Sequence, residues 1–145
     1  MKDSQIGEVD KEEMAQWIEK IFSLDKEYHR VTINAVLKYP LEEVIKAKEH
    51  AVKVELPALF EKLRDMATPK AGKCLKARNN FMKGIDAQRV AWTIDNKYGL
   101  GTLAASDWQS KSQDYLKKVW KDVFSLAEKY HIYGNDEDIG PPQSS

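Results

Sequence analysis

Residues 41–64 constrain the fold of this chain most strongly, because their apolar side chains recur at the spacing of one helical face. The run reads LEEVIKAKEHAVKVELPALFEKLR, follows Pro40 and contains a second proline, Pro57. Pro40 suits the first position of a helix, where an amide N–H has no partner within the helix. Pro57 removes one backbone hydrogen bond and predicts a kink near residues 53–57. We therefore expect a bent amphipathic helix that ends near Met66.

A run with the same period precedes this one. Asp10 has the residue type of an N-cap, and Glu13 stands three residues later, where it completes a capping box. The apolar positions from Met14 onward lie on one helical face. We expect this helix to end at Leu37, because the pre-proline residue Tyr39 is biased away from helical geometry.

A third helix is expected after a tight connection. Thr68 and Pro69 have the residue types of an N-cap and a first helical position, which predicts a helix from Pro69 to about Lys97. Its apolar stripe is the least regular of the four. Gly72 and Gly84 interrupt it, and each lowers helix propensity by about 1 kcal/mol relative to Ala.

The clearest internal stop signal is the sequence YGLG at residues 98–101. The last helix can begin at Thr102 or after Ser106. The pairing of Ser106 with Gln109 favours the second start, because it repeats the capping-box pattern. Gly134 is expected to close this helix.

Four helices of similar length, joined by short connections, favour antiparallel neighbours. The sequence therefore predicts an all-α protein, an antiparallel up-down-up-down four-helix bundle formed by residues 10–133. Residues 1–9 are interpreted as a flexible leader. Residues 134–145, which are acidic and contain proline, are interpreted as a disordered tail.

Composition excludes several classes of partner. Among 145 residues, 23 Lys and Arg balance 23 Asp and Glu, so no global field attracts nucleic acid or an anionic membrane. The single cysteine, Cys74, cannot form an internal disulfide. No apolar run is long enough for a membrane span, so we expect a soluble protein. The absence of a signal sequence indicates the cytoplasm by default, and the mature form of an exported domain would look the same.

Basic residues at the start of the third helix oppose its dipole, which favours negative charge at that end. Lys70 and Lys73 begin this group and Arg78 ends it. Glu61 and Asp65 across the turn, or simple solvation, would compensate the positive charge. The alternative is a docking site for a small anionic ligand or an acidic protein partner.

Arg78 shares the helical phase of apolar residues and is expected to point inward, where it would need a carboxylate or several carbonyls as partners. Gln88 and Arg89 follow on later turns. The favoured interpretation is a boundary position for Arg78, with only its charged end in water. The alternative is a polar pocket between helices, lined by the three residues, with residues 41–64 as one wall.

Trp120 and Phe124 stand at the edge of the apolar stripe of the last helix. An aromatic pair at such an edge either widens the core or contacts a partner. The core is the favoured interpretation, and a homodimer is the alternative.

Metal chemistry is limited by three histidines, and the only Glu-x-x-His pattern joins Glu128 to His131. Met14 and His131 belong to the first and last helices, whose near ends meet in an antiparallel bundle. In this respect the chain resembles the b-type four-helix cytochromes, and the resemblance, limited to two residues and the topology, implies haem held by Met14 and His131. There is no Cys-x-x-Cys-His motif for covalent attachment.

The chain carries no Gly-x-Ser-x-Gly elbow, no His-Glu-x-x-His motif and no glycine-rich nucleotide loop. The sequence therefore predicts a non-enzymatic binding protein without a cofactor, either a ligand-sensing or a partner-docking module. Its expected site residues are Lys70, Lys73, Arg78, Gln88, Arg89 and Trp120. A haem- or metal-binding bundle is the alternative.

Overall fold

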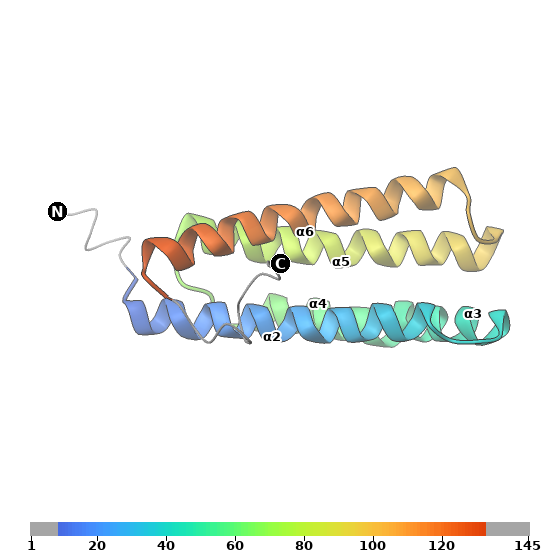
Figure 1. The fold of residues 1–145 in the computed structure, drawn as a ribbon, viewed down its shortest axis with the longest axis horizontal. Helices are drawn as coiled ribbons and strands as arrows, with labels where there is room; N and C mark the ends of the chain where they lie inside the picture. The colour runs from blue at the N-terminus through green and yellow to red at the C-terminus, as the bar shows by residue number, and fades with distance from the viewer. Residues whose placement is uncertain (1–8, 133–145) are drawn as a thin grey trace.

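The computed structural model describes residues 9–132, and this part of the chain is helical throughout except for its connections. Four helices lie along one long axis (Figure 1). The all-α class and the number of helices are thus confirmed for the described residues. The helices are α2 (Lys11–Val36), a continuous rod of α3 (Leu41–His50), η1 (Ala51–Glu55) and α4 (Leu56–Asp65), then α5 (Gly72–Tyr98) and α6 (Leu103–Lys129). The expected leader and tail fall outside the described residues, except for Val9, which is buried.

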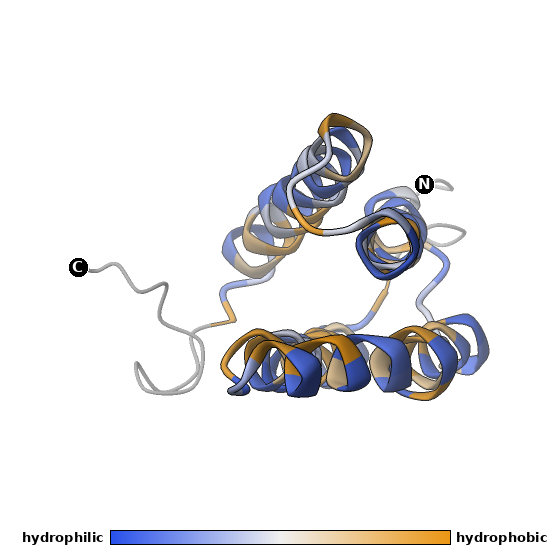
Figure 2. Cartoon of the chain, turned by 90° about the vertical axis from the view of Figure 1, so that its right-hand side faces the viewer, coloured by the Kyte–Doolittle hydropathy of each residue, from blue (hydrophilic) through white to orange (hydrophobic). Residues whose placement is uncertain are grey.

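The helices form two layers, with α5 and α6 in one and α2 and the α3–α4 rod in the other (Figure 1). The α2–α3 and α5–α6 connections lie at one end of the molecule, which faces the viewer in Figure 2, and the α4–α5 connection lies at the other end. The contact between α5 and α6 is the most extensive in the structure, whereas α2 and α6 touch at few points. The seam between α2 and α6 is therefore the least closed part of the molecule.

Two of the helix starts follow from capping side chains. The Asp10 carboxylate accepts hydrogen bonds from the amides of Glu12 at 2.7 Å and Glu13 at 3.4 Å, which confirms the predicted N-cap. At the last helix the Thr102 hydroxyl accepts a hydrogen bond from the amide of Ala105 at 3.1 Å. The favoured start after Ser106 was therefore wrong, because Thr102 already satisfies the first turn.

The predicted start of the third helix was also wrong. The Thr68 hydroxyl donates to the carbonyl of Met66 at 3.3 Å instead of accepting from an amide. The carbonyl of Pro69 accepts from the amide of Ala71 at 2.8 Å in a tight turn, and α5 begins only at Gly72. As a result the first turn of α5 has no side-chain cap.

The rod around Pro57 stays helical, and its irregularity is a π-helical turn over Ala51–Glu55, immediately before α4. A π turn adds a residue to the helix and loosens the backbone ladder, which accommodates the amide that proline lacks. The π turn overlaps residues 53–57, where a kink was predicted. Pro40 is the N-cap of α3 and not its first helical residue.

The core lies between the two layers, and α5 contributes to it on more than one side. Alongside Phe81 and Ile85, α5 buries small and polar residues: Ala77, Asn80, Gly84, Ala87, Gln88 and Ala91. A helix that contacts α6, α4 and α3 has no single apolar face. This explains why its sequence stripe is irregular.

Gly84 allows the close approach of α5 and α6. A Cβ atom built at this position would lie 3.0 Å from Leu116 Cδ2 and 3.4 Å from the carbonyl oxygen of Ser112. Gly72, at the start of the same helix, has nothing within 4 Å of the same added atom. The propensity lost at Gly84 is therefore offset by packing.

Gly84→Leu should lower the free energy of unfolding by about 1–3 kcal/mol, because a larger side chain forces the two helices apart. Gly72→Leu is the matched control and should not lower stability, because the position is open and Leu has a higher helix propensity than Gly. Urea unfolding followed by circular dichroism measures both. Equal effects at the two positions would contradict the packing role of Gly84.

Candidate ligand pocket

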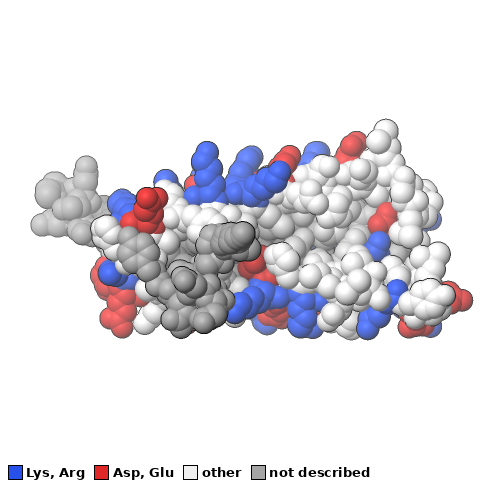
Figure 3. Space-filling model, in the orientation of Figure 1, with Lys and Arg blue, Asp and Glu red and all other residues white. Residues whose placement is uncertain are grey.

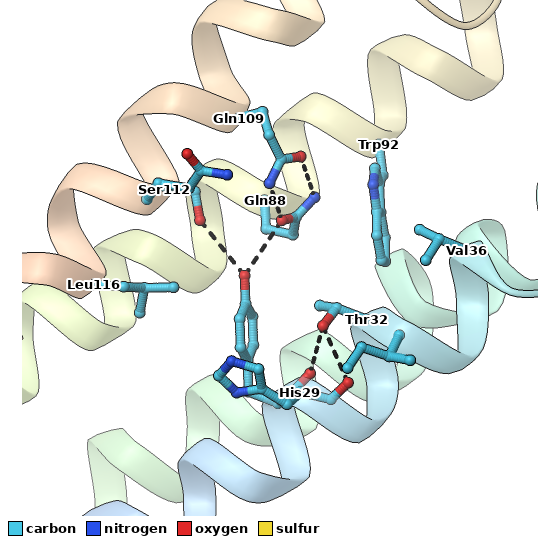
Figure 4. A pocket seen from close by; sticks show the side chains of 11 residues that line it. His29, Thr32, Val36, Gln88, Trp92, Gln109, Ser112 and Leu116 are labelled. Atoms are coloured by element: carbon cyan, nitrogen blue, oxygen red, sulfur yellow. Dashed lines mark hydrogen bonds between the residues drawn. The ribbon is translucent and has the colours of Figure 1, made fainter. Parts of the chain in front are cut away.

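A cavity of about 340 Å³ opens on the seam where α2 and α6 diverge, with α5 as its floor (Figure 4). Its volume is at the lower end of the range typical of small-molecule sites. The lining side chains are Tyr28, His29, Thr32, Ile33 and Val36 from α2, Gln88 and Trp92 from α5, and Gln109, Ser112, Gln113 and Leu116 from α6.

The floor of this pocket is a pair of glutamine amides that bond to each other twice. Gln88 Nε2 donates to Gln109 Oε1 at 2.8 Å, and Gln109 Nε2 donates to Gln88 Oε1 at 2.7 Å. The Tyr28 hydroxyl donates to Gln88 Oε1 at 3.3 Å from the opposite layer (Figure 4). Gln88 is only 2% exposed, so this network fixes the relative positions of α2, α5 and α6 in the core.

Ser112 extends the network toward the helix contact at Gly84. Its hydroxyl donates to the carbonyl of Gly84 at 2.7 Å and lies 3.5 Å from the Tyr28 hydroxyl. Burial raises the pKa of Tyr28, so its hydroxyl stays protonated and polar without charge. The floor therefore offers neutral donors and acceptors.

His29 adds a charge at the rim. Its Nδ1 lies 3.3 Å from a carboxylate oxygen of Asp25, an ion-pair distance without hydrogen-bond geometry, and 2.9 Å from the Asp25 carbonyl oxygen. The Asp25 carboxylate is the main cause that raises the pKa of His29 to about 9. The Asp25 carbonyl also raises this pKa, and partial burial lowers it. The imidazole is thus a cation at neutral pH, with half of its side chain in solvent.

A titration by nuclear magnetic resonance should give a pKa for His29 of about 9, and Asp25→Asn should lower this pKa toward the ordinary histidine value of 6.5. Because the folded pKa is raised, the ionic contribution to stability is complete below about pH 6.5 and is lost as the pH rises through about 9. Its size is limited by solvent screening at this exposed side chain. A wild-type His29 that titrates near 6.5 would contradict the pairing.

Two opposite sides of the pocket are apolar. Trp92 lies against Val36 on one side in Figure 4, and Leu116 closes the other. On α3, the nearly buried Lys48 donates to Asp95 at 3.2 Å and lies 5.5 Å from the centre of the Trp92 ring. This ion pair and cation–π contact hold the indole in place.

The structure does not bring Arg78 and Arg89 together with Gln88 around the α2–α5–α6 pocket. Arg78 is half-buried, in agreement with the favoured boundary position; its Nη2 donates to Asn79 at 3.3 Å, and its Nε has no partner within residues 9–132. Arg89 donates to the carbonyl of Val52 in the π turn at 3.4 Å and to Asp86 at 3.0 Å. Of the three residues, only Gln88 lines the α2–α5–α6 pocket, because residues one position apart on a helix point in different directions.

Lys70 and Lys73 line a second cavity, of about 360 Å³, at the uncapped start of α5, together with Lys129 of α6. Lys73 donates to the Ser125 hydroxyl at 2.8 Å. Within residues 9–132, no carboxylate forms an ion pair with Lys70 or Lys73.

Of the two expected forms of compensation, ion pairs of Glu61 and Asp65 with these lysines do not form within residues 9–132, which leaves solvation. Glu61 and Asp65 both approach Arg64, at 3.8 and 3.1 Å. Arg64 lies on the same helix as the two acids, so local pairs form in place of pairs across the turn.

Trp120 stacks on Phe22 of α2 with ring centroids 5.1 Å apart, and Phe124 completes the cluster. This cluster closes the α2–α6 seam on the side of the pocket away from the α5–α6 connection. The position agrees with the favoured interpretation of a widened core, and a role in binding stays a prediction.

Met14 and His131 differ sharply in environment. Met14 is fully buried, and its sulfur lies 3.6 Å from the thiol of Cys74. His131 is exposed just after α6, at a backbone φ of 55°. The thioether therefore faces core atoms, and haem ligation by this pair stays a hypothesis. Burial raises the pKa of Cys74 to about 12, so its thiol is not a nucleophile at neutral pH.

Sequence reasoning missed most of the pocket: Tyr28, His29, Gln109, Ser112 and Gln113. One signal was present. Ser112 occupies a core phase of the last helix between apolar residues, and a polar residue at such a phase needs a buried partner.

Comparison of the chain with models of known protein families, with curated proteins and with solved structures found no match. Within residues 9–132, no helix combines the length and the apolar character needed to cross a bilayer. The same residues contain no group of three or more His, Cys, Asp or Glu side chains placed to hold a metal ion.

Proposed function

We propose that this chain is a non-enzymatic binding protein, an antiparallel up-down-up-down four-helix bundle that takes a small ligand between α2, α5 and α6. The observation that carries this proposal is the polar floor and cationic rim of the pocket, at the seam where two helices barely touch. Pockets with a few convergent polar groups in an apolar wall are the usual form of small-molecule sites.

The pocket has hydrogen-bonding capacity that the fold does not use. Gln113 is exposed at the pocket edge, and its amide makes no hydrogen bond to another described residue. Gln109 is half-exposed and can exchange part of its bond to Gln88 for a ligand. A ligand that reaches both amides would gain directed bonds without a change of fold.

The chemistry of the walls indicates the ligand class. Protonated His29 attracts an anionic group, the amides bind a carbonyl or carboxylate, and Trp92 with Ile33 offers an apolar surface. A small aromatic or aliphatic carboxylate combines these features and fits a cavity of about 340 Å³. We therefore propose an amphiphilic organic anion as the ligand.

The test is a titration of the ¹⁵N-labelled protein with benzoate, indole-3-acetate and octanoate. Shifts of amide and side-chain signals should centre on the pocket, and Gln113→Trp, which fills the mouth, should weaken the binding about tenfold or more. Asp114→Trp is the matched control, because Asp114 is the adjacent exposed residue on α6 and does not line the pocket.

Neutral analogues separate this site from non-specific adsorption. Benzamide should bind more weakly than benzoate, and His29→Ala should remove that difference. Probes that shift no pocket signal, or equal effects of the two tryptophan variants, would show that the polar network serves the fold alone.

A second candidate function is the docking of an acidic partner at the start of α5. The observation in its favour is that Lys70, Lys73 and Lys129 surround a cavity beside amides that no side chain caps. An acidic peptide segment would meet both the lysines and the positive end of the helix.

Polyglutamate is the probe for this candidate. The triple change of Lys70, Lys73 and Lys129 to Ala should reduce its binding about tenfold at low salt, and raised salt should weaken binding to the wild type. The control changes Lys117, Lys118 and Lys121 of α6 to Ala, which removes the same charge elsewhere. Equal losses in both variants would show that polyglutamate binding depends on overall charge and not on this site.

A further inference from the structure

Two connections at one end of the molecule expose a set of large apolar side chains. We call residues 36–41 and 98–106 the loop end; both segments lie at the same pole, and that pole faces the viewer in Figure 2. The most exposed of their side chains are Tyr39 at 90% and Leu103 at 78%, and the others are also more than half exposed. These others are Leu37, Leu41, Tyr98 and Leu100. Several large apolar side chains exposed at one pole are more than the scattered single ones of an ordinary surface and indicate an interaction site.

The loop end is also almost without charge. Residues 98–106 contain no Asp, Glu, Lys, Arg or His, and residues 36–41 contain one such residue, Lys38. Lys97 borders the second segment, with its ammonium 5.3 Å from the centre of the Tyr98 ring. Three acids border the segments: Glu42 and Glu43 in the first turn of α3, where Glu43 pairs with Lys46 at 3.6 Å, and the exposed Asp107 directly after residue 106. Figure 3 shows mostly uncharged atoms at the tip of the α5–α6 hairpin.

We propose that the loop end docks the protein on the surface of a lipid bilayer that carries anionic headgroups. Leucines at the tips of the loops would enter the acyl boundary, and the tyrosines would lie at headgroup level, where aromatic rings with a polar tip are enriched. Lys38 and Lys97 would face the phosphates, with their aliphatic parts along the apolar surface. This is a peripheral contact of two loops, and it does not depend on the ligand pocket.

A second copy of the chain fits this surface less well. A stable dimer uses roughly 20–30 residues on each side, and the segments 36–41 and 98–106 offer fewer. The loops form the narrow end of an elongated molecule (Figure 1), whereas a dimer needs a broad complementary face. A bilayer accepts protruding loops without such a face.

The test is flotation of the full chain with vesicles of phosphatidylcholine alone and with phosphatidylglycerol added. The protein should float with the mixed vesicles and more weakly with phosphatidylcholine. Leu37→Asp with Leu100→Asp should lower the partition coefficient on the order of tenfold or more, because an acid replaces an apolar anchor at each loop. Val54→Asp is the matched control, since Val54 is 52% exposed in the π turn, away from the loop end, and should float as the wild type does.

A second measurement reports insertion directly. Cys74 is fully buried, so Leu100→Cys introduces the only exposed thiol in residues 9–132, and an environment-sensitive dye attached there should shift to the blue on mixed vesicles. No flotation with mixed vesicles, or flotation that the double variant leaves unchanged, overturns the proposal. A dimer that the double variant abolishes, without flotation, assigns the surface to a second copy and also overturns it. Equal flotation on both vesicle types overturns the role given to Lys38 and Lys97.

Discussion

The close contact of α5 with α6 is the interaction on which the rest of the structure depends. Gly84 lets the backbones approach, Leu116 packs over it, and Ser112 donates a hydrogen bond to the Gly84 carbonyl across the same contact. A helical carbonyl that accepts a second bond from a neighbouring helix fixes both the rotation and the register of the pair. The position of every pocket residue on α5 and α6 follows from that register.

The same contact explains why a pocket exists on the α2–α6 seam. The α5–α6 pair is held by its own packing. The contacts that α2 makes with it include the Phe22–Trp120 stack on one side of the pocket and the Tyr28 hydroxyl farther along. Between these points and the loop end, α6 diverges from α2 (Figure 1). The cavity therefore lies where two separately stabilised units meet imperfectly, as at many binding sites between helices.

The all-α class and the four helices were predictable from local rules, and the site was not. Asp10 could be recognised as a cap because a carboxylate before an amphipathic run has one favourable use. The same rule predicted Thr68 as a cap, and this prediction was wrong, because the Thr68 hydroxyl donates to the carbonyl of Met66. The pocket depends on which faces of distant helices meet, and periodicity within one helix contains no such information. His29 illustrates this, because its charge comes from Asp25 one turn away and its place at the rim comes from α6.

The Gln88–Gln109 pair raises the question of why this core buries two amides. Two leucines of similar size would avoid the desolvation of two amides, and a satisfied polar pair contributes little net stability over an apolar one. Such a pair does penalise any register in which one amide loses its partner, so it specifies the arrangement of α5 and α6 even with no ligand bound. The pair borders an open cavity, beside Gln113, whose amide makes no hydrogen bond to another described residue. An amide pair that served register alone would do so equally well in a closed core. This pair instead forms the floor of an open cavity with a cationic rim, which is the position that the proposed ligand binding requires.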